Sequence, residues 1–262
     1  MSAATVENAA PSMKAGSRIP LTRLIAVELR KSYDTLAGRW LLIAIGAITA
    51  TAIVIFFLTA DSADRTYGNF AGVTASPQAI LLPVLGVLLV TSEWSQRTAL
   101  VTFTLAPNRG RVLTAKIAAA VLLGVAAVLV ANVFAAVFTV IGGADDAWGN
   151  GSELFEIAFA KFGIFQLIQI MWGVGFGLLL LNSAAAIVAF FAVPMVISIV
   201  SELWSAMEDI GPWVDLSTSS GALFNEDGMS STEWQHLLVG VLIWVGIPLV
   251  LGTIRLLRSE VK

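Results

Sequence analysis

Residues 41–60 read LLIAIGAITATAIVIFFLTA, a run of twenty residues without a charge. A helix rises about 1.5 Å per residue, so this run spans about 30 Å, which is the thickness of the hydrocarbon core of a bilayer. Its side chains are apolar or small all round, whereas a helix of a soluble protein keeps one polar face. The run therefore predicts a helix that crosses a membrane.

Five further stretches have the same character. Together with the first they predict six spans, at residues 41–60, 75–92, 112–141, 157–181, 183–204 and 235–254. Charged residues make up 13% of the chain, about half of what a soluble domain carries on its surface. This shortage of charge disfavours the alternative of a soluble protein with unusually apolar helices. The fold class predicted is an all-α membrane protein.

The basic residues predict how the chain crosses the membrane. If the six spans are real, thirteen of the 15 Lys and Arg residues lie on one side, and Arg65 and Lys161 lie on the other. Thirteen of the 18 acidic residues lie on that other side. Because loops rich in Lys and Arg stay in the cytoplasm, we expect both termini to be cytoplasmic. The expected location is the plasma membrane, the inner membrane in a bacterium.

The chain before the first span divides into two parts. Residues 1–19 are polar, contain no apolar run of the kind found in a signal peptide, and predict a disordered cytoplasmic tail. Residues 20–262 are expected to form one six-helix transmembrane domain. Within it, residues 20–39 place leucines near helical spacing with Arg and Lys between them. This pattern predicts either an amphipathic helix lying on the cytoplasmic leaflet or a solvated helix beside the membrane.

Two connections between spans are longer than a linker requires. Residues 93–116 read EWSQRTALVTFTLAPNRGRVLTAK and predict a short cytoplasmic helix over 93–105, which Pro107 ends. Residues 205–233 form the longest outer connection and mix apolar residues with Gly, Pro and acidic residues. Long unstructured loops are uncommon, so this stretch predicts short helices that dip back toward the membrane, a re-entrant-like segment between spans five and six.

The sequence shows no catalytic constellation. It contains no cysteine and no phosphate-binding G-x-x-x-x-G-K-[ST] loop, so the chain cannot bind and hydrolyse ATP in that manner. His236 is the single histidine, and with Glu233 it offers two metal ligands, fewer than a catalytic zinc needs. Inside the fourth span, Gly173 and Gly177 predict close helix packing, and Gln166 and Gln169 predict hydrogen bonds between helices. We therefore expect no catalytic site, no metal and no bound cofactor on this chain.

The segment after span two carries a resemblance to a known family. Type-2 ABC export permeases, the membrane subunits of ATP-binding cassette exporters, have in their cytoplasmic loop a Glu–aromatic pair, a Thr, a Leu-rich turn, then Pro-x-x-Arg and a Lys. The matching residues are Glu93–Trp94, Thr98, Leu105–Ala106–Pro107, Arg111 and Lys116. The sequence departs from the pattern at Arg97, where the family often has Gly, and at Asn108–Arg109, where it often has Ser-Arg. Six spans, an amphipathic N-terminal helix and a long last outer loop agree with the same family.

The resemblance implies a partner ATPase and a set of site residues. It implies a coupling helix that docks into the ATPase subunit, with candidate contact residues Glu93, Trp94, Arg97, Thr98, Val101, Leu105 and Arg109. It also implies a translocation path bordered by spans two and five, with candidates Leu82, Leu85, Leu89, Phe190, Phe191, Met195 and Ser198. ATP and Mg would be held by two copies of the ATPase, beside a second copy of this permease or a homologous one.

The function expected from the sequence is therefore a permease subunit that exports an apolar or amphipathic compound, such as a drug, antibiotic, peptide or lipid. Lipids are the other expected partners, and nothing indicates nucleic acid. The competing hypothesis is a membrane scaffold or sensor subunit that transports nothing. A neighbouring reading frame with a phosphate-binding loop would favour the exporter, and a neighbouring sensor kinase alone would favour its rival.

Overall fold

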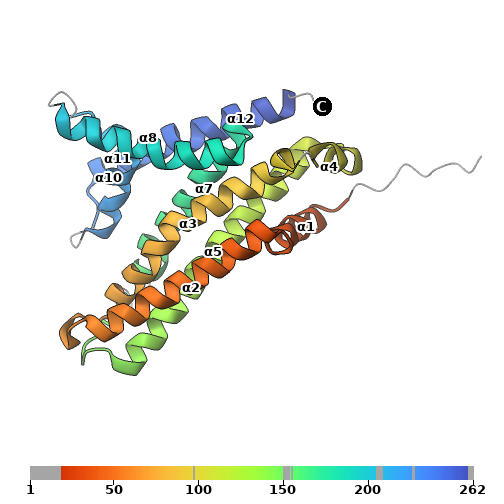
Figure 1. Ribbon diagram of the computed structural model, residues 1–262. Helices are drawn as coiled ribbons and strands as arrows, with labels where there is room; N and C mark the ends of the chain where they lie inside the picture. The colour runs from red at the N-terminus through yellow and green to blue at the C-terminus, as the bar shows by residue number, and fades with distance from the viewer. Residues whose placement is uncertain are drawn as a thin grey trace, which may run out of the picture.

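The structure is a computed structural model that describes residues 19–96, 98–149, 154, 156–204, 209–225 and 228–258. Over these residues the chain is helical and contains no strand. The predicted disordered tail, apart from Ile19, lies outside the described residues. The long helices run roughly side by side, with α1, α4 and the end of α12 close to one end of the molecule (Figure 1).

Six helices in the described part of the chain are long and apolar enough to cross a membrane, as predicted. Three of them are single helices of the N-terminal half, α2 (Leu36–Thr59), α3 (Tyr67–Ser95) and α5 (Arg109–Gly142). The others are α7 (Phe162–Leu180) with the π-helical turn η2 (Glu156–Lys161) before it, α8 (Ser183–Leu203), and α11 (Ser231–Val241) continued through the π-helical turn η5 (Leu242–Gly246) into α12 (Ile247–Arg258). The chain is therefore a multi-pass membrane protein by length and composition.

Several helices extend beyond their apolar stretches. α3 begins at Tyr67, eight residues before the predicted start, because the Thr66 side chain accepts a hydrogen bond from the Asn69 amide and caps the helix. α5 begins at Arg109, because the Asn108 side chain accepts from the Arg111 amide. The helix α8 continues through Pro194.

Helix α7 is the central helix of the bundle, and glycines set its distance from α3. A Cβ atom at Gly173 would lie 2.1 Å from the Pro83 carbonyl oxygen, and one at Gly177 would lie 2.4 Å from the Val90 side chain. The predicted close packing at both glycines is confirmed. On its other side, α7 packs against α12, where a Cβ on Gly252 would meet the Leu178 backbone at 2.6 Å.

Shorter helices complete the two ends of the bundle. Helix α1 (Leu21–Asp34) precedes α2, and α4 (Ala99–Leu105) joins α3 to α5, while a 3-10 turn η1 (Ser62–Asp64) follows α2. Between α8 and α11, the chain forms α9 (Gly211–Val214), α10 (Leu216–Gly221) and the 3-10 turn η4 (Ala222–Phe224). Leu216 is buried, and the Trp244 indole N–H donates to the Val214 carbonyl at 2.6 Å. Short helices thus form between α8 and α11, as predicted, and they pack against α11 and η5.

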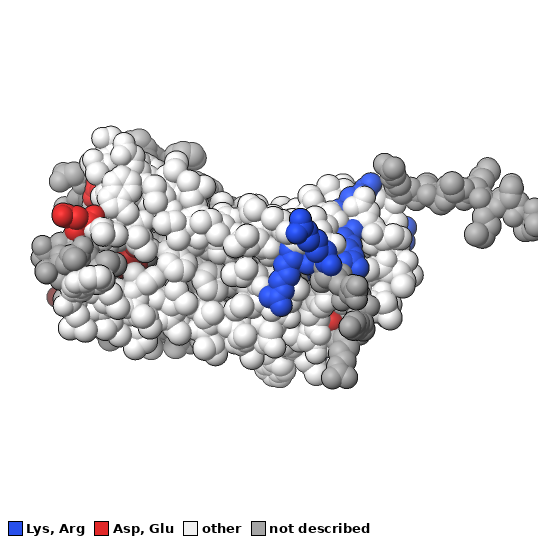
Figure 2. Space-filling view, turned by 90° about the horizontal axis from the view of Figure 1, so that it is seen from above, with Lys and Arg blue, Asp and Glu red and all other residues white. Residues whose placement is uncertain are grey.

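Charged side chains separate toward the two ends of the molecule. In Figure 2 the Lys and Arg side chains gather toward one end, and most of the visible Asp and Glu side chains lie at the other. The basic end includes residues of α1, of the start of α5 and of the end of α12. Some of these basic residues also hold helix ends, because the Arg111 guanidinium donates to the Ile19 carbonyl at 2.7 Å and Arg255 donates to the Leu179 carbonyl.

Candidate functional site: a buried ion-pair cluster beside a short exposed helix

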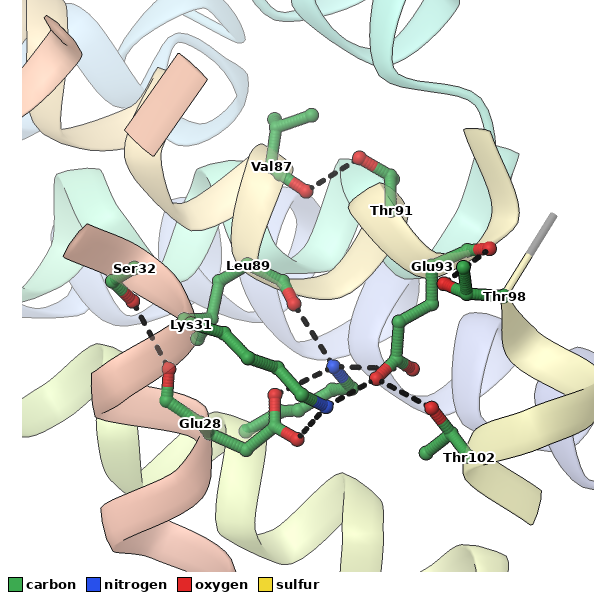
Figure 3. A network of polar contacts seen from close by, with 10 residues as sticks. Glu28, Lys31, Ser32, Val87, Leu89, Thr91, Glu93, Thr98 and Thr102 are labelled. Carbon is green, nitrogen blue, oxygen red and sulfur yellow. Dashed lines mark hydrogen bonds and ion pairs between the residues drawn. The ribbon is translucent and has the colours of Figure 1, made fainter. Parts of the chain in front are cut away.

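Four charged side chains from three helices meet at the basic end of the bundle. Glu28 and Lys31 come from α1, Glu93 from the last turn of α3, and Lys116 from the second turn of α5. Figure 3 shows Glu28, Lys31 and Glu93 pointing toward one another from α1 and α3. We call these four residues the ion-pair cluster.

Each carboxylate of the ion-pair cluster bridges both ammonium groups. The Lys31 Nζ lies 2.7 Å from Glu28 Oε1 and 2.6 Å from Glu93 Oε1. The Lys116 Nζ lies 2.7 Å from Glu28 Oε2 and 3.3 Å from Glu93 Oε2. The four charges therefore form a closed ring with alternating signs and no net charge, which ties α1, α3 and α5 together.

Most of the ion-pair cluster is out of solvent. Glu28, Glu93 and Lys116 are at most 5% exposed, and Lys116 also donates to the Leu89 carbonyl at 3.1 Å. Moving charges out of water costs several kcal/mol per ion. Removing one partner from such a group therefore lowers the stability of the protein by much more than the ion pair contributes net, because the other charge stays buried without a partner. The ring therefore fixes the relative positions of α1, α3 and α5, and removing one of its charges should destabilise the packing of all three helices.

Lys31 is the member of the ion-pair cluster nearest to solvent, with its side chain 35% exposed. Burial by itself would lower the pKa of Lys31. The charges of Glu28 and Glu93 and the hydrogen bonds to them outweigh burial, and they hold the pKa of Lys31 above its ordinary value. Lys31 is accordingly charged throughout the physiological pH range.

The ion-pair cluster is joined directly to α4. The Thr102 hydroxyl donates to Glu93 Oε1 at 3.0 Å, and the Thr98 amide donates to the Glu93 carbonyl at 2.8 Å. Figure 3 shows the Thr102 side chain turned toward Glu93. Because α4 is only seven residues long, these contacts fix its position more than its own helical hydrogen bonds can.

Helix α4 has an inner and an outer face. On the inner face, the Phe103 ring packs against Trp94 with ring centroids 6.3 Å apart. The Arg109 guanidinium lies over the Phe103 ring, 4.9 Å from its centroid. On the outer face, Leu100, Val101 and Leu105 are apolar and 53%, 58% and 73% exposed. Exposed apolar side chains that lie together commonly mark an interaction site. The exposed apolar face of α4 is therefore held in place by the bond of Thr102 to Glu93 of the ion-pair cluster.

The predicted contact residues divide between the two faces of this region. The prediction of one helix over 93–105 is wrong: α3 continues to Ser95, a break follows, and α4 begins at Ala99. Glu93 and Trp94 therefore belong to the end of span two and do not continue the face of Val101 and Leu105. Thr98 is exposed, Arg109 packs on the inner side, and Arg97 lies outside the described residues. The contact with an ATPase stays a prediction.

The predicted path residues lie in different surroundings. Leu82, Leu85 and Leu89 are buried in one hydrophobic cluster with residues of α5 and α7. In α8, Phe190 is buried against Trp172, with ring centroids 5.0 Å apart.

The remaining path residues also lie in α8. Phe191 and Met195 are exposed, and the Ser198 hydroxyl donates to Asp215 at 3.3 Å. Within one chain, the candidates from α3 and α8 do not form one continuous lining.

A cavity of about 230 Å³ opens beside the ion-pair cluster. Lys31, Leu85 and Ser183 are among the residues that line it. At its edge, Ser183 at the start of α8 shares hydrogen bonds of 2.7 Å with Thr91 and 2.8 Å with Ser95. These hydroxyl groups join α8 to the same end of α3 that carries Glu93.

No known family model matches this chain, and no curated protein matches it in sequence. Among the described residues, no group of three or more His, Cys, Asp or Glu side chains could hold a metal ion.

Sequence reasoning missed Glu28 and the burial of Lys116. Glu28 precedes Lys31 by three residues on a helix, which is a local signal for a pair. Nothing local indicates that the same carboxylate also meets Lys116, whose place in the sequence is 88 residues away. A lone Lys at the start of an apolar run reads as an interfacial residue, whereas the structure places it 2% exposed.

Proposed function

We propose that this chain is the permease subunit of an ATP-binding cassette exporter. The observation that carries the proposal is the outer face of α4, an exposed apolar patch at the basic end of the bundle that rests on a buried ring of charges. The resemblance of residues 93–116 to the cytoplasmic loop of type-2 export permeases supports it. The basic end is then the cytoplasmic end, following the positive-inside rule.

In this proposal α4 is the coupling helix. An ATPase that binds Val101 and Leu105 and moves α4 also moves Glu93, because Thr102 donates to its carboxylate. Glu93 contacts Lys31 of α1 and Lys116 of α5, so the displacement reaches three helices together. Movement of the ends of spans two and three is then the event that opens or closes a path.

The cargo we propose is an apolar or amphipathic compound. Helix α8 supports this, since Ala186 and Phe190 are the only buried residues among those described in it. Its exposed side chains include Phe191, Met195 and Ile199, all uncharged. A second permease copy facing this side of α8 would enclose a route with apolar walls, in the plasma membrane of the host, the inner membrane in a bacterium.

The test is to purify the tagged chain from its native membranes and ask what accompanies it. We expect an ATPase subunit with a phosphate-binding loop, and ATP hydrolysis in lipid that responds to cargo. The variant Val101→Asp places a charge in the proposed contact, where an unpaired buried charge costs several kcal/mol. It should release the ATPase while the permease still inserts.

Gly221→Asp is the matched control, because it adds the same charge at an exposed position of α10, where a Cβ atom meets nothing within 4 Å. It should retain the ATPase. A wild-type chain that brings down no ATPase, or a Val101→Asp chain that keeps it and transports at the normal rate, would rule out α4 as a coupling helix. A sensor kinase as the only companion would favour the scaffold hypothesis instead.

A further inference from the structure

The cavity of about 230 Å³ beside the ion-pair cluster is polar at one end and apolar at the other. Its polar lining includes the last turn of α3 and Ser183 at the start of α8, so it lies where two candidate spans end and begin. Its apolar lining includes Leu85 and Leu88, further into α3. Leu85 lies ten residues before Ser95, which is about 15 Å along a helix. The cavity therefore runs from the level of the lipid headgroups to the level of the acyl chains.

The polar end of the cavity presents hydrogen-bond donors that a ligand can reach. An ammonium group has three N–H bonds, and the Lys31 Nζ directs two of them at Glu28 and Glu93, at 2.7 and 2.6 Å. Its third N–H has no acceptor among the described residues, and the Lys31 side chain is 35% exposed. The half-buried Ser92 hydroxyl and the exposed Gln96 amide also line the cavity and have no partner in the described part of the chain.

The charges around the cavity favour an anion. Glu28 is the one acidic residue among those described in the lining, and it is 4% exposed with both oxygens bonded to lysines. The charge that reaches the cavity is therefore that of Lys31. The first turn of α2 and the first residue of α8 also line the cavity. The N-terminal end of a helix carries a partial positive charge, so both helix ends act in the same direction as Lys31.

We propose that this cavity binds an anionic phospholipid from the leaflet at the basic end of the molecule. The phosphate accepts hydrogen bonds from Lys31, Ser92 and Gln96, and an acyl chain lies against Leu85 and Leu88. The apolar end of the cavity favours a lipid as the source of the phosphate, because an acyl chain covers these leucines and a small soluble phosphate would leave them uncovered. The proposal does not depend on the chain being an exporter.

The experiment measures lipid binding to the purified full chain in detergent by native mass spectrometry. The probes are phosphatidic acid, phosphatidylcholine and diacylglycerol, each with the same two oleoyl chains. We expect phosphatidic acid to bind about tenfold more tightly than either of the others, the equivalent of one hydrogen bond to a charged group. Glycerol phosphate carries the phosphate without the chains, and at equal concentration it should not displace phosphatidic acid.

Three variants locate the site. Ser92→Ala and Gln96→Ala each remove a donor, and each should weaken the binding of phosphatidic acid about tenfold. The binding of diacylglycerol, which has no phosphate, should stay the same. Ser62→Ala is the matched control, since Ser62 is exposed in η1 at the far end of α2 and should bind all three lipids as the wild type does. Each variant is first shown to be monodisperse.

Two results on the wild-type chain alone would overturn the proposal, so it does not rest on the folding of any variant. Equal binding of phosphatidic acid and phosphatidylcholine, or binding of neither, would mean that the cavity does not recognise an anionic lipid. Displacement of phosphatidic acid by an equal concentration of glycerol phosphate would mean that the site takes a soluble phosphate. Among the variants, equal affinities of Ser92→Ala and Ser62→Ala for phosphatidic acid would place the phosphate elsewhere.

Discussion

Glu28 of α1 and Lys116 of α5 are 88 residues apart in the sequence and form an ion pair of 2.7 Å in which both side chains are at most 5% exposed. The pair anchors a short helix outside the six spans to the interior of the bundle. A surface helix held only by its apolar face could shift or detach, whereas α1 cannot leave without breaking the ion pairs of Glu28 with Lys116 and of Lys31 with Glu93.

Replacing Lys116 by Met should destabilise the protein strongly. Glu28 and Glu93 would then share only Lys31, and breaking a buried pair by removing one partner typically costs about 3–5 kcal/mol. For a chain of this size that corresponds to a fall in Tm on the order of 10 °C, measured in detergent by thermal unfolding.

The control for this prediction is Arg30→Met, which removes the exposed pair between Arg30 and Asp34 at 3.0 Å. Because exposed pairs contribute little, its Tm should stay close to that of the wild type. The double variant Glu28→Gln, Lys116→Met leaves one positive and one negative charge. It should be less unstable than the sum of the two single changes, and simple additivity would show that the two side chains are not coupled.

Thr102 should control the order of α4. In Thr102→Val the hydroxyl donor to Glu93 is lost, and hydrogen bonds to charged groups contribute about 1.5–3 kcal/mol. Hydrogen exchange of the α4 amides should therefore speed up, with the rest of the bundle unchanged. Thr104→Val is the control, since the Thr104 hydroxyl donates to the Val101 carbonyl of its own helix. If the α4 amides exchange at the same rate in both variants, the bond to Glu93 does not hold α4 in place.

The sequence predicts the six spans because an apolar run of about 20 residues is typical of a helix that crosses a membrane. It predicts the first and last residues of these helices less well. Helices α3 and α5 begin at polar caps, Thr66 and Asn108, that lie outside the apolar runs. The predicted end of span two at residue 92 is also wrong: a Glu usually marks the exit from a membrane, whereas α3 continues to Ser95. Glu93 stays within the helix because Lys31 and Lys116 neutralise it, and both come from other helices.

Cysteine labelling tests the orientation of the bundle. The chain contains no cysteine, so Asn108→Cys and Gly221→Cys each introduce a single thiol. The basic residues gathered near Asn108 predict that this position is cytoplasmic and that Gly221 is outside. In intact cells an impermeant thiol reagent should label Gly221→Cys alone, and it should reach Asn108→Cys only after permeabilisation. Labelling of both in intact cells would contradict six spans with this orientation.

The spacing of α3 and α7 predicts opposite effects for two Gly→Ala changes. Gly173→Ala brings a methyl group to within 2.1 Å of the Pro83 carbonyl oxygen, so the helices must separate and the Tm must fall. Gly46→Ala meets nothing within 4 Å and removes a flexible residue from a helix, which stabilises by about 0.4–1 kcal/mol. A similar Tm for both variants would mean that α3 and α7 are not in close contact.

Gln169 of α7 supplies a hydrogen bond that α3 cannot make for itself. Pro83 has no amide hydrogen, so the Ala79 carbonyl one turn earlier loses its normal helical partner, and Gln169 Nε2 donates to that carbonyl at 3.3 Å. Replacing Gln169 by Leu leaves the carbonyl unpaired inside the membrane and should cost about 1–3 kcal/mol.

The same relationship gives a matched background for that change. In Pro83→Ala the residue at position 83 regains an amide hydrogen that can bond the Ala79 carbonyl, so Gln169→Leu should cost much less there than in the wild type. Thermal unfolding of the two single variants and the double variant measures this coupling directly. If Gln169→Leu lowers the stability equally in both backgrounds, Gln169 does not stabilise the protein by bonding the Ala79 carbonyl. Its contribution in α7 would then come from packing.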